Sequence, residues 1–366
     1  MQFEVQKSVL LKAIADTNGA VEKRNTIEIL QNIKIDVADD KVILTATDMD
    51  ILISSEFACD MKSSGKTTVP AQMFFDIIRK IPDGAVLLKL ENNTNLQIKS
   101  GRSKFSLPCI DAEEYPSLAE GEFSNFLEIE GAKFAKIIDQ SRFAISLDES
   151  RYYLNGLYFQ AYKSDQVNQI RAVATDGHRL ALSFFDAEIS ETFAVIIPRK
   201  SVNEIRRIIE GVKNIKVAIS RTKIKITADK SMILSKLIDG EYPDYQKVIP
   251  KNNSAIALIP KKPLFDCVDR VATMAMDKHK SIKVILENGK ISFQIGSDEN
   301  VIAFEEMEVN YSGERIETGF NAKYFLDIIS HIENEEIIIR FRDSMAPALI
   351  EAKDLNSVFV IMPVRV

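Results

Sequence analysis

Asp, His and Arg, residue types that take part in acid–base and metal chemistry, come together in one segment, Thr175-Asp176-Gly177-His178-Arg179-Leu180. A metal or catalytic centre there would need further histidine, cysteine or carboxylate side chains at ligand spacing. The chain has only three histidines, His178, His279 and His331, and they are far apart in the sequence. We therefore expect no metal site and no catalytic residue. A Ser-His-Asp triad stays open as an alternative, without a GxSxG motif to support it.

Motifs of nucleotide-dependent enzymes are missing from the sequence, which has no GxxxxGK[ST] phosphate loop and no GxGxxG after a strand pattern. The plainer interpretation of Asp176-Gly177-His178 is a turn between two strands, in which Gly177 takes a positive φ. The sequence therefore favours a protein that binds partners, uses no cofactor and catalyses no reaction.

The segment belongs to a pattern that recurs along the chain. Ala46-Thr47-Asp48 returns 128 residues later as Ala174-Thr175-Asp176. The helix-like segment 74–81 aligns with 202–209 at the same offset, and again with 325–332. A fixed period indicates copies of one unit, and a unit of about 120 residues is large enough to hold its own core. Polar linkers then predict three domains, at 1–121, 126–249 and 254–366.

Each predicted domain shows the same order of hydrophobic patterns: an alternating strand, a helix-period segment and three strands, given twice. The first helix-period segment of the chain places Val9, Leu10, Ala13 and Ile14 on one face. Pro70, Pro198 and Asn321 precede the second helix of the three domains. The expected fold is therefore α+β, with two helices packed on antiparallel sheets in each of three similar domains.

Composition places the chain among globular proteins of a reducing compartment. It has 366 residues, 46% of them hydrophobic, and contains no stretch of 18 apolar residues that would span a membrane. The N-terminus opens into a strand pattern, so we expect no signal peptide. Three scattered cysteines, Cys59, Cys109 and Cys267, indicate free thiols. We expect a cytoplasmic protein without membrane contacts.

The formal net charge of −6 argues against a protein that holds DNA through phosphate neutralisation alone. Two interpretations of the basic side chains in or beside the expected helices stay open. They form solvated helix faces, or equivalent helices of the three domains line one positive surface inside an acidic shell. The side chains concerned are Lys7, Lys12, Arg79, Lys80, Lys133, Lys136, Lys200, Arg206, Arg207, Lys261 and Lys262.

Several motifs resemble one family, the bacterial DNA polymerase III beta subunit or sliding clamp, and they span all three domains in order. The motifs are 21–26 (VEKRNT), 101–107 (GRSKFSL), 151–156 (RYYLNG), 174–181 (ATDGHRLA), 239–245 (DGEYPDY) and 360–366 (VIMPVRV). The resemblance implies a DNA clamp fold and a ring of two head-to-tail subunits, with helices inside and strands outside. It also implies a processivity factor that stays on duplex DNA by encircling it.

The resemblance further implies two sets of site residues. The DNA-facing set comprises Arg24, Gln72, Arg79, Asp148, Tyr152, Tyr153 and Lys200. Gln72 and Asp148 stand where the family leads us to expect a basic and a neutral polar residue. We therefore expect weaker contacts with DNA at these two positions.

The second set forms an apolar groove for a short linear motif of partner proteins. It comprises Leu154, Thr175, Gly177, His178, Arg179, Leu180, Pro243, Lys247, Val248, Asn321, Tyr324, Met345, Pro347, Val360, Met362, Pro363, Val364 and Arg365. Lys247 replaces an arginine often found there, and Pro347 stands in place of a small polar residue. For Met362 and Val364, a last strand packed in the core stays open as an alternative.

For ring closure we expect an edge strand of the first domain, carrying Phe105, to meet the third domain of a second copy near Met274. The resemblance implies as partners duplex DNA, the polymerase III alpha subunit, clamp loader subunits, translesion polymerases and repair proteins. Two rival interpretations remain, a monomeric scaffold that binds only proteins and a DNA-processing enzyme. Native mass separates the scaffold from the ring, and an enzyme would need a metal cluster.

Overall fold

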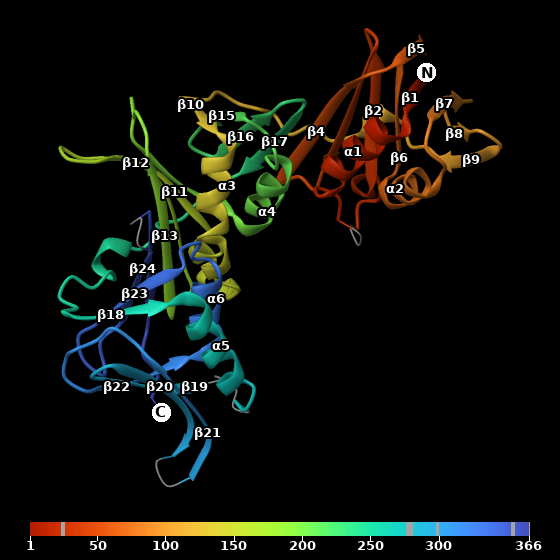
Figure 1. Ribbon diagram of the computed structural model, residues 1–366. Coiled ribbons are helices and arrows are strands. Elements are labelled where there is room, and N and C mark those ends of the chain that lie inside the picture. Colours follow the sequence, from red (N-terminus) through yellow and green to blue (C-terminus); the bar gives the residue numbers. More distant parts are fainter. Residues whose placement is uncertain (23–25, 276–280, 298–299, 353–355, 366) are drawn as a thin grey trace. The chain divides into compact units, whose positions relative to one another are not determined.

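The computed structural model describes residues 1–22, 26–275, 281–297, 300–352 and 356–365. The chain divides into two compact units, which we describe separately (Figure 1). Unit 1 comprises Met1–Ala135 and Lys200–Leu237, and unit 2 comprises Lys136–Arg199 and Ile238–Val366. Among the residues described, none of the helices has both the length and the apolar character needed to cross a lipid bilayer.

The first third of the chain contains two helices, each followed by a group of strands. Its elements are β1 (Gln2–Gln6), α1 (Lys7–Asn18), η1 (Glu28–Gln31), β2 (Asn32–Ala38), β3 (Lys41–Thr47), β4 (Ile51–Ala58), β5 (Asp60–Ser63), β6 (Gly65–Pro70), α2 (Ala71–Lys80), β7 (Ala85–Glu91), β8 (Asn95–Ser100), β9 (Ser103–Pro108) and η2 (Ala112–Glu114). The short strand β5 was not expected from the sequence pattern.

The second third repeats this order without a counterpart of β5. Its elements are β10 (Asn125–Glu130), α3 (Gly131–Asp139), η3 (Arg142–Ala144), η4 (Glu149–Leu154), β11 (Gly156–Lys163), β12 (Asn168–Thr175), β13 (Arg179–Asp186), β14 (Phe193–Pro198), α4 (Arg199–Ile208), β15 (Asn214–Ile219), β16 (Lys223–Ala228), β17 (Ser231–Lys236) and η5 (Tyr245–Lys247).

The last third repeats the order again. Its elements are β18 (Ala255–Pro260), α5 (Lys261–Ala272), β19 (Ser281–Glu287), β20 (Lys290–Ser297), β21 (Asn300–Glu308), β22 (Ile316–Asn321), α6 (Ala322–Ser330), β23 (Glu336–Phe341), β24 (Ala348–Ala352) and β25 (Ser357–Ile361). The α+β fold of three similar segments, each with two helices on antiparallel strands, is confirmed.

The helices form because their apolar residues recur at helical spacing and are buried on one face. In α1 the buried residues are Leu10, Ala13, Ile14 and Thr17, which follow one another at intervals of three, one and three residues. The second helix of each third buries an equivalent residue, namely Phe74 in α2, Val202 in α4 and Phe325 in α6. The repeat in the sequence is therefore a repeat of core positions.

Unit 1 contains a five-stranded sheet, in the order β5-β1-β7-β8-β9, and an eight-stranded sheet, in the order β10-β15-β16-β17-β4-β3-β2-β6. The larger sheet joins the first and second thirds of the chain, because β4 pairs antiparallel with β17 and Ile53 lies opposite Ile233. In the smaller sheet β9 is an edge strand, with pairing only to β8 among the described strands.

Unit 2 has the corresponding arrangement. Its eight-stranded sheet runs β14-β11-β12-β13-β25-β24-β23-β18, and its four-stranded sheet runs β21-β20-β19-β22. Strand β13 pairs antiparallel with β25, which joins the second and last thirds and places Ala181 opposite Phe359. The compact units thus cut across the three-domain boundaries at 121, 126, 249 and 254, which stay a prediction. They do so because strand pairing continues from each third into the next.

Candidate functional site: a turn, a helix and the C-terminal strand

The segment Asp176-Gly177-His178 connects β12 to β13 as a tight turn, as the sequence pattern predicted. Gly177 has φ of 89°, a value that side chains with a Cβ rarely adopt. One carboxylate oxygen of Asp176 accepts from the backbone N–H groups of His178 and Arg179, at 2.9 and 3.0 Å. The hydroxyl of Thr175 accepts from the N–H of Gly177 at 3.1 Å. These contacts hold the turn in one conformation.

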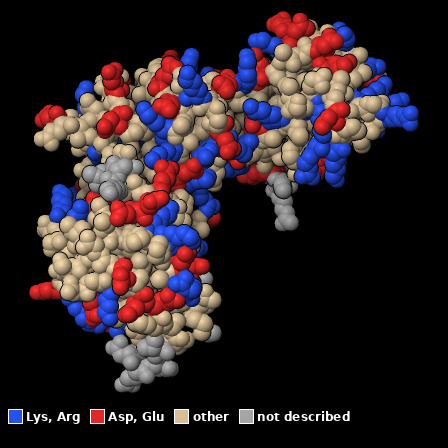
Figure 2. Space-filling model, in the orientation of Figure 1, with Lys and Arg blue, Asp and Glu red and all other residues tan. Residues whose placement is uncertain are grey.

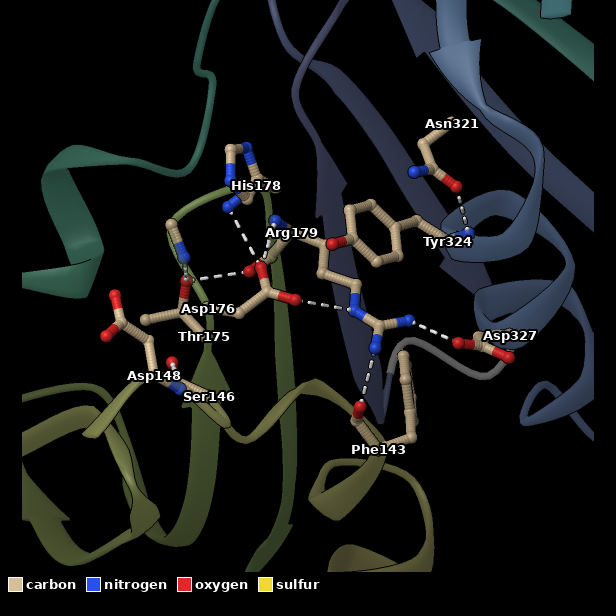
Figure 3. A network of polar contacts seen from close by, with 11 residues as sticks. Phe143, Ser146, Asp148, Thr175, Asp176, His178, Arg179, Asn321, Tyr324 and Asp327 are labelled. Carbon is tan, nitrogen blue, oxygen red and sulfur yellow. Dashed lines mark hydrogen bonds and ion pairs between the residues drawn. The ribbon is translucent and has the colours of Figure 1, made fainter. Parts of the chain in front are cut away.

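Arg179 begins β13, and its guanidinium lies buried at the centre of a polar network (Figure 3). Nε lies 3.1 Å from Oδ2 of Asp176, and Nη1 lies 2.6 Å from Oδ2 of Asp327 on α6. Nη2 donates to the carbonyl of Phe143 at 2.8 Å. Cζ of the guanidinium lies over the ring of Tyr324, 4.4 Å from its centroid. Its side chain is 8% exposed, so Arg179 is bound inside the protein rather than presented to solvent.

Beside this network, the exposed ring of His178 and the half-buried ring of Tyr324 form an aromatic rim. The ring of His178 stacks on that of Tyr324 with centroids 6.1 Å apart. Tyr324 is positioned by Asn321, whose side-chain oxygen accepts from its backbone N–H at the start of α6. Burial raises the pKa of Tyr324 above its usual value, and the carboxylates of Asp176 and Asp327 raise that pKa further, while the guanidinium of Arg179 opposes the rise. The phenol is therefore neutral at physiological pH.

Three of the predicted groove residues, Leu154, Leu180 and Val360, belong to one buried apolar cluster, which we call the groove cluster. It also contains Tyr242 and Leu349, which were not among the predicted groove residues. The C-terminal segment is held beside it, because the N–H of Met362 donates to the carbonyl of His178 at 2.8 Å. The turn at 176–178, the start of α6 and the end of β25 thus belong to one connected region of unit 2.

Apolar side chains on the exposed parts of unit 2 include Val248, Met345 and Met362, which are 42%, 70% and 36% exposed. The N–H of Val364 donates to the carbonyl of Gly319 at 2.9 Å, so the segment after β25 follows β22. For Met362 and Val364 both alternatives, a core strand and a groove surface, therefore stay open. Each side chain is partly exposed, while the backbone N–H of each residue is hydrogen-bonded within unit 2. Pro363 and Pro347 are half-buried, whereas Pro243, Lys247 and Arg365 are exposed.

Three DNA-facing candidates of unit 1, Gln72, Arg79 and Lys200, lie on helices and contact carboxylates. Arg79 on α2 lies 3.0 Å from Oδ1 of Asp76, and the side-chain amide of Gln72 donates to the other oxygen, Oδ2. Lys200 on α4 lies 2.5 Å from Oδ2 of Asp48. Arg24 lies outside the described residues. Figure 2 shows acidic and basic side chains interspersed over the visible face.

In unit 2 the DNA-facing candidates lie on or beside η4. Asp148 precedes η4 and accepts from the N–H of Ser150. Hydrogen bonding by Ser150 lowers the pKa of Asp148 below its usual value, and Nε of Arg151, 2.9 Å away, lowers it further. Tyr152 is 55% exposed, and its ring packs edge to face on the ring of Tyr153. The negative charge of Asp148 is therefore partly neutralised within the loop.

The two apolar candidates for subunit contact are exposed. Phe105 is 38% exposed on the edge strand β9, and Met274 is 40% exposed just after α5. Sequence reasoning missed two further apolar side chains, Ile302 and Phe304, which are 55% and 53% exposed on the edge strand β21. Their alternation along one strand, with acidic residues around them, was the signal that could have indicated them.

Comparison with known proteins matches the chain over its whole length. Models of the N-terminal, central and C-terminal domains of the DNA polymerase III beta subunit match residues 1–119, 128–244 and 246–365. The beta sliding clamp of Caulobacter vibrioides is 38% identical, and that of Pseudomonas aeruginosa is 33% identical, each over 100% of both chains.

Solved structures agree with these relatives. A Caulobacter crescentus beta sliding clamp superposes with a TM-score of 0.94 at 36% identity, covering 100% of this chain and 99% of that one. A sliding clamp from Bartonella birtlesii, bound to griselimycin, superposes with a TM-score of 0.95 at 35% identity and covers 100% of both chains. The chain belongs to the DNA polymerase III beta subunit family, the beta sliding clamps.

Proposed function

We propose that two copies of this chain close head to tail into a ring that encircles duplex DNA, slides along it and tethers DNA polymerase. The chain is a processivity factor and not an enzyme. The observation that carries this proposal is the threefold repeat of one α+β unit, matched along its whole length by the three domains of the sliding clamp family. Two such chains supply six similar units for a closed ring.

Encirclement explains how an acidic protein stays on DNA. A protein that binds by neutralising phosphates is usually basic, whereas this chain carries a net charge of −6. A closed ring is retained by topology, so its contacts with phosphates can be weak and non-specific. The ion pairs of Arg79 with Asp76 and of Lys200 with Asp48 fit this requirement, because they soften the positive charge that each side chain presents.

For ring closure we propose that β9 of one subunit lies along β21 of the other. Both are edge strands with exposed backbone hydrogen-bonding groups, which natural proteins otherwise protect from association. The apolar side chains Phe105, Met274, Ile302 and Phe304 would then be buried at the contact. Burial of a large apolar side chain contributes roughly 1.5–3 kcal/mol, so these residues together can hold a dimer.

Charge also favours this pairing. The hairpin that ends in β9 carries Arg102 and Lys104, while β21 carries Glu305, Glu306 and Glu308. Opposite charge on two edges steers their encounter and sets which edge meets which. A basic edge against an acidic edge selects the head-to-tail arrangement over contact between two identical edges.

The DNA path remains a proposal for each residue named: Arg24, Gln72, Arg79, Asp148, Tyr152, Tyr153 and Lys200. The exposed Tyr152 supplies an aromatic face and a hydroxyl, both suited to a sugar–phosphate backbone without base readout. We expect contacts of this kind to guide the duplex without arresting it.

For partner proteins we propose a groove between the turn at 176–178, the start of α6 and the segment after β25. Apolar anchors of a short peptide would lie against the groove cluster and Met362, while His178 and Tyr324 would orient it. Its partners are the polymerase III alpha subunit, clamp loader subunits, translesion polymerases and repair proteins. Griselimycin, which is bound to the Bartonella birtlesii relative, is a ready probe, and we expect it to compete with the peptide.

The cellular location of the chain is also a proposal. We place it in the cytoplasm, where chromosomal DNA and its replication enzymes meet. We also propose domain boundaries at 1–121, 126–249 and 254–366, which follow the repeat. The two compact units have other limits and do not test these boundaries.

Native mass spectrometry tests the ring against the rival monomeric scaffold. The ring requires a species of twice the 41.2 kDa chain mass at micromolar concentration, with or without DNA. A monomer over the whole concentration range would favour the scaffold that binds only proteins.

A further inference from the structure

Arg179 was predicted as a wall of the partner groove, yet its guanidinium faces inward and binds three protein groups (Figure 3). We propose that Arg179 and Asp327 form a positioning strut, which ties the turn at 176–178 to α6 and so sets the shape of the groove without touching the peptide. This inference rests on the proposed function of the groove. It assigns a role to Asp327, a residue outside the predicted groove.

The strut attaches to Phe143 and to α6, and these two parts of the protein also contact each other. Phe143, whose carbonyl accepts from Arg179, stacks on the ring of His331 with centroids 4.4 Å apart. His331 follows α6, and its Nδ1 lies 2.7 Å from the carbonyl oxygen of Asp327. Phe143 and the end of α6 therefore form one support. Arg179 is the side chain that connects the turn to this support.

The internal repeat provides a comparison within the same chain. In unit 1 the equivalent of Phe143 is Ala15, and the equivalent of Asp327 is Glu204 on α4. Arg207 bridges them there: Nη1 donates to the carbonyl of Ala15 at 2.8 Å, and Nη2 lies 2.6 Å from Glu204. Both units thus close the same position with a guanidinium, a backbone carbonyl and a carboxylate.

The two bridges differ in where the arginine comes from. Arg207 lies on α4, one turn after Glu204, and leaves the turn of unit 1 out of the bridge. The residue at the position of Arg179 in unit 1 is the buried Ile51. In unit 2 the arginine comes instead from the strand that follows the turn. In unit 1 a separate side chain ties the turn to α4, because Lys200 lies 2.5 Å from Oδ2 of Asp48. In unit 2 Arg179 alone joins the turn, the carbonyl of Phe143 and the carboxylate on α6, in the region proposed to bind peptides.

The link has a direct consequence for the groove surface. His178 precedes Arg179, its ring stacks on Tyr324, and its carbonyl accepts from the N–H of Met362. Fixing Arg179 therefore fixes the aromatic rim and the start of the C-terminal segment together. A preformed rim lowers the ordering cost of binding, and that cost is a main determinant of the affinity of a short flexible ligand.

Loss of the Asp327 carboxylate should loosen the turn while leaving the apolar groove cluster in place. Asp327→Asn keeps the size of the side chain but removes the charge that holds Nη1 of Arg179. We expect the affinity for a fluorescein-labelled peptide with two leucine anchors to fall about tenfold, mainly through faster dissociation. Asp327→Glu restores a carboxylate and should recover most of the affinity.

Glu204→Gln is the matched control, because it makes the same change in the bridge of unit 1. We expect Glu204→Gln to lower the unfolding temperature about as much as Asp327→Asn does, and to leave peptide affinity unchanged. Amide hydrogen exchange over residues 175–179 reports the strut directly. Exchange there should be faster in Asp327→Asn than in wild type, and unchanged in Glu204→Gln.

The outcomes separate the strut from the groove itself. If wild type and Asp327→Asn bind the peptide equally, the strut is overturned and the groove stands. If the wild-type dimer does not bind the peptide, the groove assignment fails and the strut falls with it. Should Asp327→Asn not yield folded dimers, Asp327→Ala decides through exchange at 175–179 and peptide affinity, because it also removes the carboxylate. Exchange faster than wild type with weaker peptide binding supports the strut, and unchanged exchange with unchanged affinity overturns it.

Discussion

Nη1 of Arg179 lies 2.6 Å from Oδ2 of Asp327, although the two residues are 148 positions apart in the sequence. Arg179 begins β13, and Asp327 lies in α6. Their ion pair therefore connects the second third of the chain to the last third, beside the pairing of β13 with β25. The region proposed to bind partner peptides is thus built where two repeats of the chain meet.

The C-terminal segment should be required for peptide binding and not for dimer formation. Deletion of residues 362–366 removes Met362 and the hydrogen bonds from the backbone N–H groups of Met362 and Val364. We expect the deletion to weaken binding of the leucine-anchored peptide beyond detection in fluorescence anisotropy. Native mass serves as the folding control and should still show the dimer. Full peptide affinity in the truncated dimer would place the groove elsewhere.

Ring closure should depend on the two exposed edges. Charged side chains in place of Phe105 and Met274 cost the contact its apolar burial, roughly 1.5–3 kcal/mol for each residue. The double variant Phe105→Asp, Met274→Asp should therefore be monomeric at micromolar concentration in light scattering. Phe126→Asp is the matched control, because Phe126 is 69% exposed on β10, another edge strand, and should leave the dimer intact. A dimeric double variant would refute this interface.

DNA contact and peptide contact should separate in two single variants. Tyr152→Ala removes an exposed ring proposed to face DNA, whereas Met345→Ala removes an exposed side chain proposed to face the peptide. We expect Tyr152→Ala to lower loading onto nicked circular DNA several-fold with unchanged peptide affinity, and Met345→Ala to do the reverse. The two assignments would be contradicted if either variant changed both measurements equally while remaining dimeric.

Gly131 should be required for stability at the start of α3. A Cβ at this position would lie 2.1 Å from the carbonyl oxygen of Val212, a backbone atom that cannot move aside cheaply. We expect Gly131→Ala to lower the free energy of unfolding by about 1–3 kcal/mol, the usual cost of overpacking. Urea unfolding measures this as a lower midpoint at unchanged slope. An unchanged midpoint would show that the start of α3 can shift.

Much of the fold could be predicted from the sequence because the repeat places equivalent residues at equivalent core positions. Phe74, Val202 and Phe325 align by their offsets and are all buried. The turn at Gly177 was also predictable, since its residue types require it. The strand β5 was not, because its four residues are mostly exposed and carry no apolar alternation.

The site was less predictable, because its decisive contacts join distant parts of the chain. Arg179 stood in an evident motif, yet neither its burial nor its partner Asp327 can be read from local spacing. The pair of Asp148 and Arg151 lies three residues apart, a spacing that could have indicated it. Ile302 and Phe304 were hidden among strand residues, since exposure depends on β21 being an edge.

Encirclement itself is tested most directly by retention of the loaded dimer on nicked circular DNA, before and after the circle is cut. A binder held by 6–10 phosphate contacts would lose roughly 10³–10⁵-fold in affinity between 50 and 200 mM salt, on circles and linear DNA alike. The ring should instead stay on the circle through this rise in salt and dissociate once the circle is linearised. Equal loss from circular and linear DNA would contradict the account.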